Sequence, residues 1–325
     1  MLRKGAKMAI ESLQALCTAM DQVALQTWRR LEDSRLPGRR FDETSITDSN
    51  LDAMRRRVPG LLIWQSSQSN ERETGADWEW WIGDDNEGWL SLRMQAKRAY
   101  EDDTYAQLRH GGADGDSFQY DTLIRGCDAD KGYYPFHVFY NGWPKGYFHP
   151  GTHWAVPAQW NACPNMRSYV ECGHAEPRHY GCAIASSHDV KHLCDAQDPS
   201  RYSIVNLLSR AVPWSYAFGF PPPKMNQEHR WDSRIDRGNW LDRIHGTLVV
   251  LSERGGASGA RDAAGHLHQI PLDRGKRTFD LPTYVQSMRR TAPGFFEPST
   301  EGEVPAAQHT VIVERPPKRK RAPRR

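Results

Sequence analysis

Residues 74–97 read TGADWEWWIGDDNEGWLSLRMQAK and decide the fold class of this chain. Two extended runs, residues 74–83 and 89–98, flank an Asp/Asn/Gly-rich stretch at residues 84–88. Aromatic and aliphatic side chains in the two runs, with turn-forming residues between them, are typical of a β-hairpin. The hairpin is therefore the feature from which we interpret the rest of the sequence.

The predicted hairpin gathers polar side chains on one face of its sheet. Asp77 and Glu79 share a face of the first strand, and Gln95 and Lys97 share a face of the second, because side chains alternate along a strand. With the turn centred near residues 85–86, antiparallel pairing places Asp77 within about one residue of Gln95. An acid, an amide and an ammonium group are thus expected to cluster.

That cluster suits phosphodiester hydrolysis, which needs a hard divalent cation held by oxygen ligands. The expected metal ligands are Asp77 and Gln95, with Glu79 or an acid from residues 71–73 completing the set. Lys97 is then expected to hold the attacking water and to offset negative charge on the phosphate oxygens. The alternative is a surface ion pair across an amphipathic hairpin, worth roughly a few tenths of a kcal/mol.

Other elements are predicted on both sides of the hairpin. Helices are expected at residues 7–34, 46–57 (capped by Thr44 or Ser45), 118–127 and 284–290, and strands at 61–65, 134–142 and 246–252. The first of these helices is amphipathic, and we expect it to pack on the core.

The order of these elements resembles the PD-(D/E)xK nuclease superfamily. The order is a helix with the acid Glu43, a strand, a strand with Asp77, a strand with Gln95-Ala96-Lys97, a helix and a strand. More narrowly, it is similar to the D…QxK variant found in Mrr-like restriction endonucleases. The TGADWEWW and QAK blocks also look like those of an uncharacterised bacterial domain family assigned to that superfamily.

The resemblance implies an α/β fold with a restriction endonuclease-like αβββαβ core and a mixed four-stranded sheet. It implies a nuclease that depends on Mg²⁺ or Mn²⁺, favours DNA over RNA and serves in defence against foreign DNA. Asp77, Gln95, Lys97 and Glu43 would be the catalytic set, and Gln119 is a weaker candidate for substrate contact. Cutting both strands of a duplex would favour a homodimer. The alternative is a non-catalytic nucleic-acid-binding or scaffold protein that kept the fold.

The expected organisation has four parts. These are an N-terminal helix (residues 1–38), the nuclease-like core (39–142), a C-terminal extension (143–295) and a mostly disordered basic tail (296–325). The last eight residues, KRKRAPRR, hold six of the 43 Lys and Arg residues. Of these, we expect Lys318, Arg319, Lys320 and Arg321 to attract phosphate with an affinity that falls with salt. A solvated solubility tail is the alternative.

The number of cysteines and the start of the sequence indicate the cellular compartment of the protein. Only six cysteines are present, and no signal-peptide pattern opens the chain, so a cytoplasmic protein with no membrane association is expected. Four cysteines lie between residues 163 and 194, where Cys163, Cys172, His174 and Cys182 are a weak structural zinc candidate. Because no CxxC pair occurs, core thiols and a surface imidazole are the alternative.

Overall fold

The predicted hairpin is present in the computed structural model of the chain. Strand β2 (Trp78–Asp84) pairs antiparallel with β3 (Gly88–Arg98), and Trp80 lies opposite Leu92. The Asp84 carboxylate accepts hydrogen bonds from two backbone N–H groups of the turn and so closes it. The structure describes residues 10, 12–34, 41–100, 102, 104–109, 111, 117–142, 180–196, 202–208, 210–218, 240–253, 276–299 and 302–314.

Within these residues the hairpin belongs to a mixed sheet of eight strands in the order β6-β5-β4-β3-β2-β8-β1-β7. The other strands are β1 (Leu62–Ser66), β4 (Tyr133–Tyr140), β5 (Cys182–Ser186), β6 (Val212–Pro213), β7 (Gly294–Phe296) and β8 (His309–Glu314). Strand β4 pairs parallel with β3 and antiparallel with β5. The α/β class is confirmed, but the sheet is twice as wide as the four strands expected.

Strand β8 lies in the middle of the sheet, although its residues were expected in a disordered tail. It pairs antiparallel with β1 and parallel with β2, so it lies between two strands that are consecutive along the chain. Val311, Ile312 and Val313 are fully buried. A β-branched run covered on both faces has the burial that stabilises a central strand. The described residues from 296 to 314 are therefore part of the fold.

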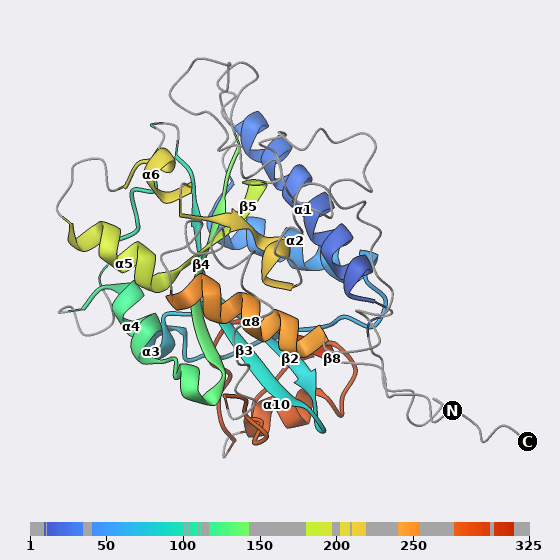
Figure 1. Cartoon of the computed structure of the whole chain (residues 1–325). Coiled ribbons are helices and arrows are strands. Elements are labelled where there is room, and N and C mark those ends of the chain that lie inside the picture. The colour runs from blue at the N-terminus through green and yellow to red at the C-terminus, as the bar shows by residue number, and fades with distance from the viewer. Residues whose placement is uncertain are drawn as a thin grey trace, which may run out of the picture.

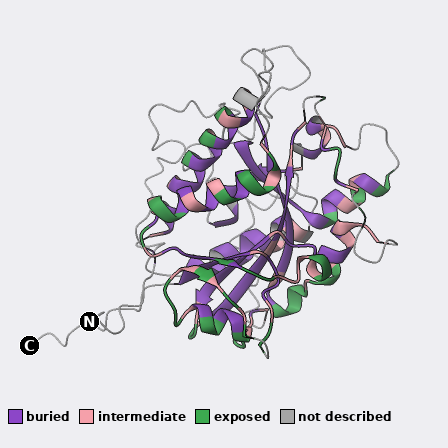
Figure 2. Cartoon of the chain, turned by 180° about the vertical axis from the view of Figure 1, so that it is seen from behind, coloured by how far each residue is buried: buried purple, intermediate pink, exposed green. Residues whose placement is uncertain are grey.

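Helices cover both faces of the sheet (Figure 1). On one face α1 (Leu13–Ser34), α2 (Glu43–Arg57) and α8 (Trp240–Glu253) bury Trp78 and Trp80. The other face is covered by α4 (Gln119–Arg125), α5 (Ser187–Asp195), α6 (Ile204–Leu208) and α10 (Thr283–Met288). Short helical turns are α3 (Glu71–Thr74), η1 (Ala129–Lys131) and η6 (Trp214–Phe218). The strands between these layers are largely buried (Figure 2).

Helix α8 replaces the strand predicted for residues 246–252. Its buried residues Leu241, Ile244, Leu248 and Leu251 recur at three- and four-residue spacing, which places them on one face of a helix. The prediction was wrong because a short apolar run with two valines fits a strand and a buried helix equally well. The helix expected near residues 284–290 is present as α10.

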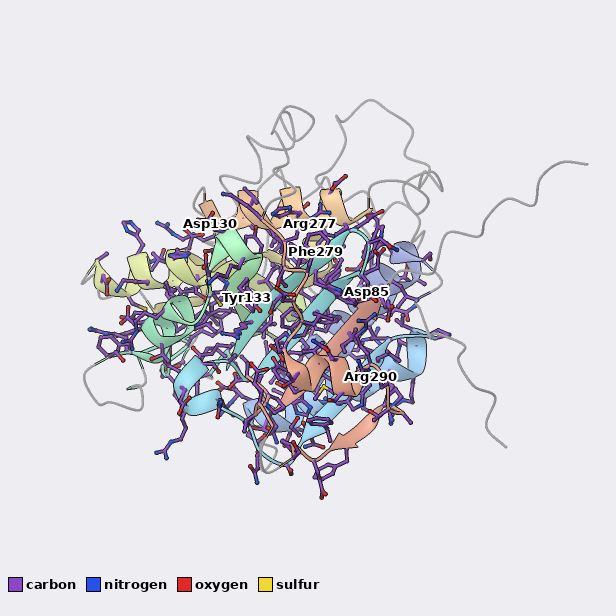
Figure 3. All side chains as sticks on the ribbon, turned by 90° about the horizontal axis from the view of Figure 1, so that it is seen from below. Asp85, Asp130, Tyr133, Arg277, Phe279 and Arg290 are labelled. Carbon is purple, nitrogen blue, oxygen red and sulfur yellow. The ribbon has the colours of Figure 1, made fainter. Side chains whose placement is uncertain are left out.

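The turn end of the hairpin is covered by a distant segment. Residues 276–280, which carry Arg277 and Phe279 (Figure 3), pair with Trp89 through two backbone hydrogen bonds between Trp89 and Thr278. Arg277 also donates to the carbonyl of Glu87 and pairs with Asp242 of α8. The cavity described below lies at the opposite end of the hairpin. No helix within the described ranges is long and apolar enough to cross a membrane.

Candidate functional site

A cavity of about 220 Å³ lies where β2 begins and β3 ends. Elements from both helical layers and from β8 contribute to its wall. The lining residues are Glu43, Thr44, Thr47, Glu71, Asp77, Ala96, Lys97, Gln107, Gln119, Gln308 and His309. Four of the residues predicted from the sequence, Glu43, Asp77, Lys97 and Gln119, are therefore brought to one site.

Asp77 is fixed against the strand that carries the other predicted residues. Its backbone N–H donates to the Met94 carbonyl over 2.9 Å, and its Oδ2 accepts from the Ala96 N–H over 2.5 Å. These two hydrogen bonds bracket Gln95, as the predicted register requires. Burial raises the pKa of Asp77 to about 7, although the Lys97 charge and the Ala96 N–H act to lower it. Asp77 is thus a carboxyl group held where a cation would stabilise its ionised form.

Glu71 is the second acid beside Asp77. It begins the short helix α3, lines the cavity and acts to raise the pKa of Asp77 by charge and hydrogen bonding. The sequence offered this acid as one of two alternatives for completing the metal ligands. The structure brings it, rather than Glu79, to the cavity.

Lys97 and Glu43 lie close together in the cavity wall. The Lys97 side chain is nearly buried, its Nζ donates to Gln119 Oε1 over 3.3 Å, and it lies 3.9 Å from Glu43 Oε2. Glu43 opens α2, and its Oε1 accepts from the Arg98 N–H over 3.0 Å. Burial raises the pKa of Glu43, while the Lys97 charge acts to lower it. The helix start is set by Asp42, whose carboxylate accepts from the Ser45 N–H, and not by Thr44 or Ser45.

Gln95, expected as a metal ligand, is fully buried and is not among the residues that line the cavity. Both polar atoms of its carboxamide, Oε1 and Nε2, lack a hydrogen-bond partner among the described residues. Its neighbour on β4 is His137, whose Nδ1 lies 2.9 Å from Ser187 Oγ. Buried amides are normally paired, so this carboxamide has the capacity to bind a further group.

Glu79 does not reach the cavity, contrary to its expected role as a metal ligand. Its Oε1 accepts hydrogen bonds from Tyr284 Oη at 2.6 Å and Thr310 Oγ1 at 3.2 Å. Burial raises its pKa, and the charge of Arg93 acts to lower it. Glu79 therefore ties β2 to β8 and α10. Its partners lie more than 200 positions away, so alternation on the hairpin could not reveal them.

His309 is the functional candidate that the motif did not contain. It opens β8, lines the cavity and places Nε2 at 2.8 Å from Oδ1 of Asp48 on α2. The only sequence signal for it is the β-branched run that follows, which is typical of a strand. Thr47 is a further addition, since its Oγ1 contacts both the Glu43 carbonyl and Tyr140 Oη at 2.9 Å. This threonine thereby supports the first turn of α2.

The other predicted site residues divide into two groups. Cys182 lies in β5 as a buried thiol, with its Sγ 3.4 Å from Thr27 Oγ1 and 3.5 Å from Asn50 Nδ2. Burial raises its pKa to about 12, which suits a core thiol and opposes a thiolate ligand. The remaining candidates lie outside the described residues, namely Cys163, Cys172, His174, Lys318, Arg319, Lys320 and Arg321.

The donor set at the cavity fits a hard cation such as Mg²⁺. Within the described ranges, no three His, Cys, Asp or Glu side chains are close enough together to hold an ion by themselves. Mg²⁺ commonly uses one or two carboxylates, with waters and substrate phosphates filling its other positions. Asp77 and Glu71 supply two adjacent carboxyl groups at the cavity, whereas the unpartnered carboxamide of Gln95 does not line it. The carboxyl oxygens of Asp77 and Glu71 therefore agree with the usual coordination of Mg²⁺.

Comparison with known proteins gives one match. A model described as "Family of unknown function (DUF6615)" matches residues 16–319. No curated protein and no solved structure matches the chain. Because the matched range covers most of the sequence and every residue that lines the cavity, the chain belongs to the DUF6615 family.

Proposed function

We propose that the cavity is the active site of a divalent-metal-dependent nuclease, which hydrolyses phosphodiester bonds in nucleic acid. The observation that carries the proposal is the convergence of Asp77, Lys97 and Glu43 on one cavity from three different elements. A surface ion pair needs neither a cavity nor a buried lysine, so that alternative accounts poorly for the arrangement. The order α2-β1-β2-β3-α4-β4 along the chain also agrees with the order of the resembled core.

Asp77 and Glu71 would hold the cation, and Gln95 would offer a neutral oxygen. When bound, a divalent ion supplies Lewis acidity that polarises the phosphate and lowers the pKa of a bound water. The raised pKa of Asp77 supports this assignment, because a buried carboxyl group without enough positive charge nearby is one that a cation stabilises. Gln95 supports it through its two unpartnered polar atoms.

Lys97 would bind the phosphate that is being cleaved. Its contacts with Gln119 and Glu43 hold the ammonium group at the cavity wall in one orientation. A donor held in place before the substrate arrives stabilises charge that develops in the transition state without first reorganising. Gln119 would then act mainly by positioning Lys97.

Nucleic acid is the proposed substrate, with DNA ahead of RNA and defence against foreign DNA as the setting, as the resemblance implies. The basic residues 318–321 would add affinity for the phosphate backbone. A homodimer would allow both strands of a duplex to be cut, by the symmetry of the substrate.

The experiment is a cleavage assay of the full chain on plasmid, single-stranded DNA and RNA, with and without Mg²⁺ or Mn²⁺. Asp77→Asn is expected to abolish the metal-dependent cleavage. The matched control is Asp85→Asn, an acid at the turn end of the same hairpin, which should cut at the wild-type rate. Wild-type protein that binds these nucleic acids but cuts none of them would overturn the proposal in favour of a non-catalytic binding protein.

A further inference from the structure

His309 brings an imidazole to the cavity from a part of the chain outside the nuclease-like motif. It is 5% exposed and opens β8, the strand beside β2. Its partner across the two strands is Trp78, the residue that follows Asp77. His309 therefore shares the face of Trp78, opposite that of Asp77, and lines the same cavity as Asp77 at the end of the two strands.

Asp48 lies beside the His309 imidazole and orients its ring. Asp48 lies on α2, the helix that also carries Glu43, and its Oδ1 is 2.8 Å from His309 Nε2. A carboxylate accepts hydrogen bonds and does not donate them, so this contact favours the tautomer with its hydrogen on Nε2, which leaves the lone pair on Nδ1. Burial lowers the pKa of His309 even though Asp48 acts to raise it, which favours the neutral imidazole.

Two other groups in the cavity wall already have partners. Lys97 donates to Gln119 and faces Glu43, so it offers positive charge and no lone pair. Asp77 accepts from the Ala96 N–H and interacts with Glu71. Among the described lining residues, this leaves His309 as the neutral group with a basic nitrogen.

We propose that His309, oriented by Asp48, accepts the proton of the water that attacks the phosphodiester in this cavity. This inference rests on the proposed nuclease function and adds a catalytic residue to it. The water oxygen forms a bond to phosphorus with its lone pair, and its proton passes to Nδ1 of His309. The bond from phosphorus to the leaving sugar oxygen breaks, and that oxygen keeps the electron pair and takes a proton from solvent. His309 then returns its proton to solvent, so the net change is the addition of one water molecule.

The imidazolium formed in this step would be stabilised by the Asp48 carboxylate beside it. The same carboxylate holds the ring in one orientation, so Asp48 is a positioning residue and His309 the catalytic one. Proton transfer by a positioned side chain commonly contributes about 10²–10⁴-fold to a rate. The effect of losing His309 should therefore fall on kcat and leave KM nearly unchanged.

The test compares His309→Ala, His309→Gln and Asp48→Asn with wild type in the Mg²⁺-dependent cleavage assay. Both His309 variants are expected to lose about 10²–10⁴-fold in kcat, and Asp48→Asn should lose less. Added imidazole should restore part of the activity of His309→Ala, because a free base can then enter the vacated space. His192→Ala, which removes an exposed imidazole on α5, is the matched control and should cut at the wild-type rate.

Binding of Mg²⁺ in the absence of substrate, measured by calorimetry, separates this role from that of a metal ligand. The proposal expects the His309 variants to keep wild-type affinity for Mg²⁺. It is overturned by a loss of that affinity, by a loss of cleavage that imidazole does not rescue, or by a folded His309→Gln variant that cuts at the wild-type rate. That last result, obtained while Asp77→Asn is inactive, would leave the nuclease proposal standing. Absence of cleavage by wild type would instead contradict the nuclease proposal itself.

Discussion

Oδ2 of Asp77 accepts a 2.5 Å hydrogen bond from the backbone N–H of Ala96. Ala96 lies between Gln95 and Lys97, so this bond ties the acid of one strand to the middle of the amide-and-lysine motif on the next. The relationship explains how residues nearly 20 positions apart are held at one end of the hairpin. Oδ1, the second carboxylate oxygen of Asp77, takes no part in this hydrogen bond.

Replacing the two adjacent acids should remove the cation site. Asp77→Asn and Glu71→Gln each delete one charged oxygen ligand while keeping side-chain size, and each is expected to weaken Mg²⁺ binding at least about tenfold. Isothermal titration calorimetry on the full chain measures this directly. The control Asp85→Asn should bind like wild type. Equal affinity in all four proteins would contradict the assignment of ligands.

Replacing Lys97 should slow cleavage without affecting the fold. Lys97→Ala removes the buried ammonium group, and loss of one such preorganised donor commonly costs about 10²–10³-fold in kcat. Lys97→Arg should be nearly as slow, because the planar guanidinium does not fit a point-charge site. Steady-state kinetics, with circular dichroism to check folding, measures the effect. Lys131→Ala on η1 is the control, and a fast, folded Lys97→Ala protein would contradict the role.

Replacing Glu79 should change stability and leave cation binding intact. Glu79→Ala leaves the buried hydroxyls of Tyr284 and Thr310 without their acceptor, which should lower the free energy of unfolding by about 2–4 kcal/mol. Urea denaturation measures the loss, and calorimetry measures Mg²⁺ affinity. A folded Glu79 variant with weakened Mg²⁺ binding would restore this residue to the ligand set.

Asp21 makes the stability of the fold depend on pH. It is buried on α1, its Oδ1 accepts from Ser215 Oγ, and burial raises its pKa from 3.8 to about 7. The folded protein thus holds a proton that the unfolded chain loses, so this contribution to stability is present below about pH 4 and is lost as the pH rises to about 7.

Asp21→Asn removes this titration. The variant should gain stability relative to wild type as the pH rises from 4 to 8, by about 1–4 kcal/mol across the interval. Urea unfolding at both pH values measures the difference. The substitution Asp52→Asn, at a partly exposed position on α2, serves as control. A difference between Asp21→Asn and wild type that does not change with pH would refute the prediction.

The sequence alone determined the central hairpin and the register of its motif. Period-two alternation in β2 and β3, with an Asp/Asn/Gly turn between them, specifies which side chains share a face, because both strands and their turn are contiguous. The spacing from Asp77 to Gln95 and Lys97 followed from this local geometry. A helix at residues 46–57 was likewise indicated by periodicity, although the helix begins earlier, at Glu43, with Asp42 as its cap.

Tertiary structure decided the features that depend on distant segments. Residues 310–313 were expected in a disordered tail, and their place as a strand between β1 and β2 is set by pairing and burial with strands more than 200 positions away. That placement delivers His309 to the cavity and Thr310 to Glu79. Local alternation says which face a side chain occupies, whereas the partner that meets it there depends on how the whole chain packs. For that reason the sequence indicated Asp77 and Lys97, and only the fold could separate Glu79 from the site and add His309 to it.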